Sequence, residues 1–132
     1  FMGICLGFQL LFSQSEEFEN CNGLDVVRGT VRKFDFNNKN IKVPQIGWNK
    51  IYNKNGWNNS SLKNIKQEEY MYFVHSYYVD PLDKSNILTN TKYEGFEYCS
   101  SIKKNNIFAT QFHPEKSGNR GIEIYRNWSK LL

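Results

Sequence analysis

The sequence predicts an α/β protein with a mixed sheet, and three observations support this class. The stretch "FMGIC" is typical of a buried strand, and it runs directly into the apolar, helix-like stretch "LGFQLLFSQS". Segments rich in β-branched and aromatic residues follow, separated by Gly, Asn and Pro, as is usual for strands. Residues 118–132 carry apolar side chains at helical spacing. With 132 residues, the chain is long enough for one domain with one hydrophobic core.

The elements are expected in the following order. Residues 1–5 form a strand in the middle of a sheet, and residues 6–15 form a short buried helix that ends at Ser13–Ser15. Further strands are expected at 24–36, 41–52 and 69–79, followed by a hairpin over 95–113 that turns at Asn105–Asn106. The last helix is expected to cover the sheet with Ile122, Tyr125, Trp128 or Ser129, and Leu132. A central first strand needs neighbours on both sides, so we expect the sequence to be the C-terminal part of a longer protein.

The composition argues against several classes of function. The 17 Lys and Arg residues are interleaved with 13 Asp and Glu and form no basic run, which argues against a nucleic-acid partner. There is no signal peptide and no apolar run long enough to span a bilayer, so we expect a cytoplasmic protein without a membrane partner. The three cysteines and two histidines lie in no metal-ligand spacing, and we expect no metal site. Cys21 and Cys99 are expected to be inert thiols.

Cys5 stands between Gly3 and Gly7 in "GICLG". If the strand turns sharply into the helix at Cys5, the residues two before and two after the corner approach closely, and both glycines avoid a Cβ clash. The start of a helix favours the thiolate, and the Leu6 N–H is placed to donate to an oxyanion. The alternative is a buried cysteine in a tight turn, which the short motif alone does not exclude.

The second candidate stretch is "ATQFHPEKSG", residues 109–118. His113 ends an apolar strand, and Glu115 follows on the same turn. A nucleophilic cysteine needs a base, and the base needs a third group that fixes its tautomer. Because strand ends and helix starts converge at one edge of a parallel sheet, we expect His113 and Glu115 to meet Cys5. The alternative for His113 is a surface histidine, but its combination with a corner cysteine favours catalysis.

These motifs resemble those of a known family. "GICLGFQLLF" and "QFHPEKSG" are similar to the class I (triad) glutamine amidotransferases, with their G-[IV]-C-x-G-x-Q corner and F-H-P-E turn. Within the class, "VPQIGWN" and "YFVHSYYV" resemble the glutaminase subunit of imidazole glycerol phosphate synthase, of histidine biosynthesis. The resemblance implies the C-terminal portion of a flavodoxin-like three-layer fold, with residues 1–132 as a partial domain that lacks upstream strands and a glycine-rich oxyanion loop. Gln45 departs from the family, which usually has His there.

The resemblance also implies roles for the residues of the catalytic centre. Cys5 would attack the side-chain amide of glutamine and form a γ-glutamyl thioester. His113 would take the thiol proton, pass it to departing ammonia and then activate water, while Glu115 orients His113. The Leu6 N–H would be half of the oxyanion hole. No cofactor is implied.

The substrate contacts are carried over from the family in the same way. Gln9, one helical turn after Cys5, matches a contact to glutamine. Glu17 matches the acidic contact to the substrate amino group by resemblance only, because a straight helix would carry it about 18 Å from Cys5. Glu16 is its local competitor. The segment Ser76–Tyr77 matches the backbone that holds the substrate carboxylate.

The implied partner is a synthase subunit with a (β/α)8-barrel, which would form a heterodimer with this chain and receive the ammonia. Lys116 matches a position at that interface, although an ordinary solvated lysine is the alternative. His75 is either a structural strand histidine or a residue near the interface. The aromatic strand at 69–79 suits an interface and a core equally.

Three hypotheses on function stay open at this point. The first is the glutaminase of histidine biosynthesis, whose partner makes imidazole glycerol phosphate and AICAR. The second is a paralogue that supplies ammonia for amidation of a surface-polysaccharide sugar, which Gln45 keeps open. The third is an inactive fragment or scaffold, and we expect residues 1–132 alone to have little glutaminase activity.

Overall fold

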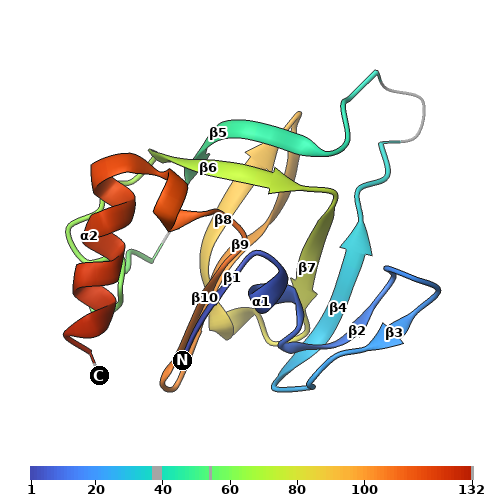
Figure 1. Cartoon of the computed structure of the whole chain (residues 1–132), viewed down its shortest axis with the longest axis horizontal. Helices are drawn as coiled ribbons and strands as arrows, with labels where there is room; N and C mark the ends of the chain where they lie inside the picture. Colours follow the sequence, from blue (N-terminus) through green and yellow to red (C-terminus); the bar gives the residue numbers. More distant parts are fainter. Residues whose placement is uncertain (37–39, 54, 132) are drawn as a thin grey trace.

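The computed structural model describes residues 1–36, 40–53 and 55–131. Over these ranges its main sheet is mixed and has eight strands, in the order β1-β10-β9-β7-β4-β2-β3, with β8 paired to β9 (Figure 1). The strands are β1 Met2–Ile4, β2 Phe12–Ser15, β3 Cys21–Asn22, β4 Val27–Lys33, β7 Tyr77–Pro81, β8 Ile87–Tyr93, β9 Phe96–Lys104 and β10 Ile107–Thr110. A second sheet pairs β5, Gln45–Ile51, with β6, Glu69–His75. The predicted α/β class with a mixed sheet is confirmed.

Within the described residues, two α-helices and two short 3-10 turns complete the fold. They are α1 Leu6–Gln9, α2 Gly118–Ser129, η1 Lys84–Asn86 and η2 Pro114–Lys116. None of the helices in the described residues is long and apolar enough to cross a membrane. The helix predicted at the end of the chain is confirmed over 118–129, whereas Leu132 lies outside the described residues.

The helix predicted over 6–15 is wrong beyond Gln9. After α1 the chain turns, and Phe12–Ser15 pairs in parallel with β4, with Phe12 opposite Val27. Phe12 is fully buried and packs edge-on against Phe8, so burial and strand pairing outweigh the helix-like apolar run. Because α1 ends early, the chain folds back toward the sheet. The proposed contact of Glu17 with the substrate requires such a turn.

The strand predicted over 69–79 is in fact two strands. It divides at Ser76, because β6 pairs with β5 in the small sheet and β7 pairs with β4 in the main sheet. The strands predicted over 24–36 and 41–52 are present as β4 and β5, while β8 was not predicted. The β9–β10 hairpin is confirmed, and Asn105 takes the left-handed φ of 52° that its turn needs without glycine.

The small sheet has one buried face and one exposed face. Residues alternate along both strands, so Met71, Phe73 and His75 point into the core while Ile46 and Trp48 lie exposed on the outside. In Figure 1 this two-stranded sheet crosses the molecule next to the ends of β1 and β10. The arrangement places a largely apolar outer surface beside the segment that follows β10.

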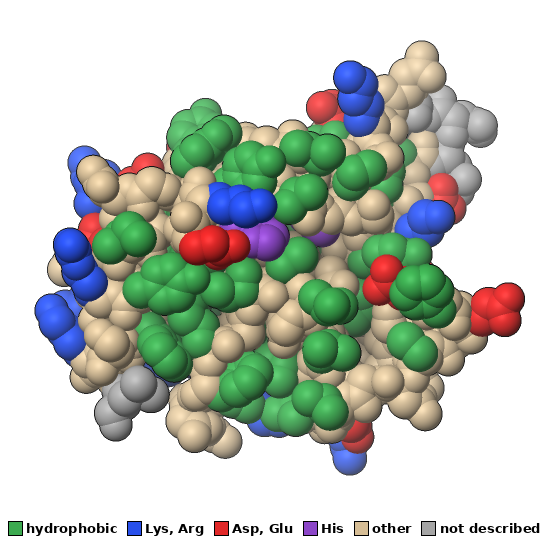
Figure 2. Space-filling view, in the orientation of Figure 1, with side chains coloured by type: hydrophobic (Ala, Val, Ile, Leu, Met, Phe, Trp, Pro, Cys, Tyr) green, Lys and Arg blue, Asp and Glu red, His purple; other side chains and the backbone are tan. Residues whose placement is uncertain are grey.

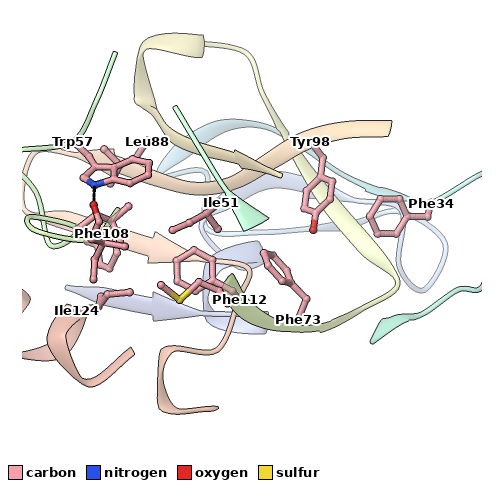
Figure 3. Packing of buried hydrophobic residues seen from close by; sticks show 12 residues of the cluster. Phe34, Ile51, Trp57, Phe73, Leu88, Tyr98, Phe108, Phe112 and Ile124 are labelled. Atoms are coloured by element: carbon pink, nitrogen blue, oxygen red, sulfur yellow. Dashed lines mark hydrogen bonds between the residues drawn. The ribbon is translucent and has the colours of Figure 1, made fainter. Parts of the chain in front are cut away.

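Helix α2 packs on the core through a face that differs from the predicted one. Ile124 is fully buried and Trp128 packs against the same cluster, but Ile122 is 43% exposed, so its predicted core position is wrong. The reason is Gly121, where a Cβ would lie 1.8 Å from the carbonyl oxygen of Pro114. This close approach turns the 121–124–128 face inward. Figure 3 shows Phe73 and Phe112 side by side in the middle of this cluster, with ring centroids 5.8 Å apart.

Candidate active site

Cys5 occupies a strained corner between β1 and α1. Its φ of 52° and ψ of −105° are unusual for a residue with a side chain, and its N–H donates to the Thr110 carbonyl at 2.8 Å. A Cβ on Gly3 would lie 2.7 Å from the Gly7 carbonyl oxygen, so the prediction that position 3 must be glycine is confirmed. A Cβ on Gly7 would meet nothing within 4 Å, so the corresponding prediction for position 7 is wrong. Position 3 must therefore lack a Cβ because the backbone of Gly7 is close, whereas position 7 has room for a Cβ.

His113 and Glu115 form a hydrogen-bonded pair after β10. The His113 Nδ1 lies 2.5 Å from the Glu115 Oε1. A carboxylate can only accept, so Nδ1 carries the proton in a neutral ring and Nε2 holds the free lone pair. This Nε2 is buried and has no hydrogen-bond partner among the described residues. The Tyr125 hydroxyl approaches the other Glu115 oxygen at 3.5 Å. The arrangement leaves one ring nitrogen as an available base.

Strand β6 brings Cys5 and His113 to the same edge of the fold. The Cys5 Sγ lies 3.9 Å from the Val74 carbonyl oxygen, and the His113 N–H donates to the Tyr72 carbonyl at 2.9 Å. Carbonyls two residues apart on one strand point the same way, about 7 Å from each other. The bare imidazole nitrogen makes no hydrogen bond to the thiol in this structure. Such contacts in unliganded sites often form only with substrate present.

The Cys5 thiol is not shifted toward the thiolate. Burial raises its pKa above the usual value, and the negative charge of Glu115 adds to this effect. The Leu6 N–H, the Gln111 side chain and the charge of Lys116 lower the pKa, but burial outweighs them. The helix start favours the thiolate through the Leu6 N–H, as expected, but α1 has only four residues and burial outweighs this effect, so the net pKa of Cys5 is raised.

The substrate-side residues surround this edge. The Leu6 N–H, at the start of α1, acts on the Cys5 sulfur and lowers the pKa of the thiol. The Gln9 Nε2 donates to the Tyr77 carbonyl at 3.2 Å and to the Gln111 Oε1 at 3.0 Å. Gln111 was not predicted as a site residue. The only signal in the sequence was a glutamine within the apolar segment that leads to His113, and its full burial appears only in the structure.

The two candidate acidic residues differ in their surroundings. The Glu16 carboxylate accepts from the Lys33 N–H at 2.9 Å and lies 3.4 Å from Arg32. In the described part of the chain, the Glu17 carboxylate makes no hydrogen bond or ion pair. Ser76 joins β6 to β7, whose first residue, Tyr77, accepts a hydrogen bond from Gln9. Glu17 is thus the one of the two whose charge is unengaged.

His75 lies beneath the site in a buried polar network. Its Nδ1 is 2.7 Å from the Tyr77 carbonyl oxygen, and its Nε2 is 3.2 Å from the Tyr98 hydroxyl. The Tyr98 hydroxyl also lies 2.8 Å from the Gln45 side chain. Burial lowers the pKa of His75 to about 4, and the nearby His113 acts in the same direction. This environment favours the structural alternative for His75.

The remaining candidates are at the surface or inert. Lys116 is exposed, with its Nζ 5.7 Å from the ring centroid of Tyr72. Cys21 is exposed, and Cys99 is buried with a raised pKa because of that burial. Within residues 1–36, 40–53 and 55–131, no group of three or more His, Cys, Asp or Glu side chains is placed to hold a metal ion. Figure 2 shows histidine near the middle of one face, flanked by acidic and basic side chains and bordered by hydrophobic ones.

The site consists of a cysteine at a strand-to-helix corner and a histidine–glutamate pair at the same edge of a mixed α/β sheet. This arrangement resembles the triad amidotransferases. Residues 1–130 match the model of the family described as Glutamine amidotransferase class-I, and the chain belongs to this family. The predicted family is confirmed.

Curated relatives narrow the comparison further. The chain is 46% identical over 128 residues to "Imidazole glycerol phosphate synthase subunit HisH" of Chlorobium luteolum, covering 97% of this chain and 62% of the relative. It is 47% identical over 133 residues to the protein of the same name in Methanocaldococcus jannaschii, covering 100% of this chain and 64% of the relative. The chain therefore spans less than two thirds of the length of these relatives.

Solved structures share the fold. A protein described as a GMP synthase subunit, from Thermoplasma acidophilum, matches with a TM-score of 0.67 at 20% identity, over 98% of this chain and 55% of that one. A glutamine amidotransferase from Thermotoga maritima matches with a TM-score of 0.58 at 22% identity, over 99% of this chain and 48% of that one. These likenesses confirm the predicted fold class.

Proposed function

We propose that the chain is the catalytic part of a glutaminase, which hydrolyses glutamine to glutamate and ammonia for imidazole glycerol phosphate synthase. The observation that carries the proposal is the His113 ring: Glu115 holds Nδ1, and the buried Nε2 is left bare at the edge where Cys5 stands. The names of the relatives support the pathway. The relatives are longer than this chain, and the complete enzyme would include further strands and a second oxyanion donor.

The reaction starts from a neutral thiol, since burial raises the pKa of Cys5. As the sulfur attacks the side-chain carbonyl carbon of glutamine, its proton passes to the His113 Nε2 and the Leu6 N–H donates to the developing oxyanion. The intermediate collapses, the C–N bond breaks, and His113 protonates the leaving ammonia. His113 then takes a proton from water, which attacks the thioester, releases glutamate and restores the thiol. Glu115 keeps the imidazole in the required tautomer throughout.

Substrate recognition follows from the groups that remain available. Both N–H groups of the Gln9 amide are used inside the protein, so its Oε1 is left as an acceptor toward the substrate. The unengaged carboxylate of Glu17 suits the ammonium group of glutamine. Backbone N–H groups of Ser76–Tyr77 would hold the substrate carboxylate.

The outer face of the β5–β6 sheet is the proposed docking surface for the synthase subunit. It presents an apolar strip, defined by Ile46, Trp48, Tyr70, Tyr72 and Val74. Ile46 is 63% exposed, Trp48 55% and Tyr70 51%. Ammonia must be passed on before it is protonated or lost, which requires a partner that covers this edge. We propose a (β/α)8-barrel subunit that forms a cytoplasmic heterodimer with this protein, contacts Lys116 and carries the lyase half of the reaction.

A second candidate uses the same chemistry with another acceptor, the amidation of a surface-polysaccharide sugar. Gln45, which departs from the usual histidine, motivates it. However, Gln45 is buried, and its side chain accepts a hydrogen bond from Tyr98 rather than one from the Cys5–His113 edge, as far as the described residues show. We therefore prefer the histidine pathway, because the names of the relatives support it. The two candidates differ in the molecule that accepts the ammonia.

The test is a Cys5→Ala variant of the complete protein, assayed with the barrel subunit. We expect glutamine-dependent synthesis of imidazole glycerol phosphate to be abolished while synthesis with added ammonium salt continues. A variant that retains the glutamine-dependent rate would refute the nucleophile. An unsubstituted pair that makes no imidazole glycerol phosphate from either nitrogen source would refute the pathway.

A further inference from the structure

Gln111 contacts both the proposed nucleophile, Cys5, and a proposed substrate-binding residue, Gln9. It has itself been assigned neither role. It follows β10, and its N–H donates to the Ser100 carbonyl at 2.8 Å. Its side chain is fully buried. The Gln111 Nε2 lies 3.7 Å from the Cys5 Sγ, and its Oε1 accepts from the Gln9 Nε2 at 3.0 Å. One buried amide therefore touches both residues.

The hydrogen-bond partners fix which end of this amide faces the sulfur. Gln9 donates one N–H to the Tyr77 carbonyl, which can only accept, so its Nε2 is on the side of Tyr77 and Gln111. Its second N–H then requires an acceptor from Gln111, which is Oε1. The Nε2 of Gln111 is consequently directed at Cys5. A flipped Gln111 amide would set two N–H donors against each other in a buried site, at a cost no partner offsets.

We propose that Gln111 is a positioning residue, which donates a hydrogen bond to the Cys5 sulfur to favour its thiolate and holds the Gln9 amide with Oε1 toward the substrate. The second role rests on the proposed function, whereas the first concerns the thiol alone. A hydrogen bond to sulfur strengthens as negative charge develops there, so this donor acts mainly when the proton leaves for His113. It thus opposes the burial that keeps Cys5 protonated.

The first role is tested by alkylation of Cys5 with iodoacetamide as a function of pH, followed by mass spectrometry of the peptide that carries it. A Cys21→Ser background removes the exposed competing thiol. Gln111→Met keeps the side-chain length but removes the donor. We expect the midpoint of the alkylation profile to rise by about one pH unit, which lowers the rate at pH 7 about tenfold. Gln14→Met, the same substitution at an exposed position of β2, should leave the midpoint unchanged.

A second variant separates the two roles. Gln111→Glu removes the N–H donor but keeps an oxygen that accepts from Gln9. It should raise the alkylation midpoint as Gln111→Met does, yet raise the KM for glutamine less than Gln111→Met. An alkylation midpoint equal to that of the unsubstituted protein, in whichever of the two variants folds, would overturn the proposal.

The alkylation readout does not depend on turnover. A raised midpoint in a protein that proves unable to hydrolyse glutamine would support the Gln111–Cys5 contact and refute the proposed function. A normal midpoint in a protein that hydrolyses glutamine would refute the Gln111–Cys5 contact and support the proposed function. Circular dichroism identifies the variants that are folded, so a merely structural effect is separated from the shift in the midpoint.

Discussion

The N–H of Cys5 donates to the carbonyl of Thr110 at 2.8 Å, across the parallel pair of β1 and β10. This bond fixes the corner cysteine to the end of the strand that continues to His113. The two candidate catalytic residues therefore hold their relative positions through sheet hydrogen bonds rather than through a flexible loop. The geometry of the site therefore depends on the close backbone approach at the corner between β1 and α1.

That corner predicts opposite responses at its two glycines. Gly3→Ala places a methyl group 2.7 Å from the Gly7 carbonyl oxygen, so we expect the free energy of unfolding to fall by about 1–3 kcal/mol. Gly7→Ala meets nothing within 4 Å, and we expect no loss or a gain of up to about 1 kcal/mol from helix propensity. Urea unfolding of both variants measures the difference. Equal destabilisation of the two would show that the corner is wrongly described.

The hydrogen bond between Glu115 and His113 predicts a large kinetic effect. Glu115→Gln places an amide next to Nδ1, and the amide N–H favours the tautomer with its proton on Nε2, which cannot act as the base. We expect kcat for glutamine hydrolysis to fall about 10²- to 10⁴-fold with a smaller change in KM. Glu123→Gln, which loses its ion pair with Arg120 on α2, is the matched control and should keep its kcat. A Glu115→Gln variant with normal kcat would remove Glu115 from the triad.

His75 predicts a defined loss of stability in acid. Its pKa is about 4 in the folded protein and about 6.5 when unfolded, so protonation favours the unfolded state between these values. We expect the free energy of unfolding to decrease by about 3 kcal/mol in total as the pH falls from about 6.5 to about 4, and to be unaffected by His75 above that window.

The control for this titration is His75→Asn, whose side-chain amide can still donate to the Tyr77 carbonyl. Chemical unfolding at several pH values should give a flatter dependence for the variant than for the unsubstituted protein. Parallel curves for the two proteins would contradict the assignment of the acid sensitivity to His75.

The apolar strip predicts where the proposed synthase subunit binds. Trp48→Ala should weaken binding of the synthase subunit by a factor of at least about ten, because a large aromatic side chain at an interface centre often contributes more than about 1.4 kcal/mol. Leu82→Ala is the control, since Leu82 is 75% exposed in the turn between β7 and η1. Isothermal titration calorimetry gives both values of Kd. Equal affinity for the two variants would place the interface elsewhere.

The sequence allowed candidate catalytic residues to be proposed, but it did not reveal the contacts that surround them. Cys5, His113 and Glu115 were accessible because short-range spacing and turn residues identify a corner and a strand end. Gln111 was not predicted because its contacts are to residues far away in the chain, Cys5 and Gln9, that only the folded sheet brings together.

The errors in the fold have the same physical origin. The apolar run that contains Phe12 fits a helix by itself, and its pairing with β4 makes it a strand. The division at Ser76 depends on two different pairing partners, β5 and β4, rather than on a local break in composition. The inward turn of Gly121 depends on the carbonyl of Pro114, which local helical periodicity does not include. Contacts outside the local sequence pattern therefore decided each of these cases.

The most direct measurement is covalent labelling of the complete protein with a chloroketone analogue of glutamine, followed by peptide mass spectrometry. We expect one label, on Cys5, with loss of glutaminase activity in proportion to labelling and protection by glutamine. Inactivation that leaves Cys5 unmodified, or a label that glutamine protects on Cys21 or Cys99 instead, would contradict the assignment of Cys5 as the nucleophile.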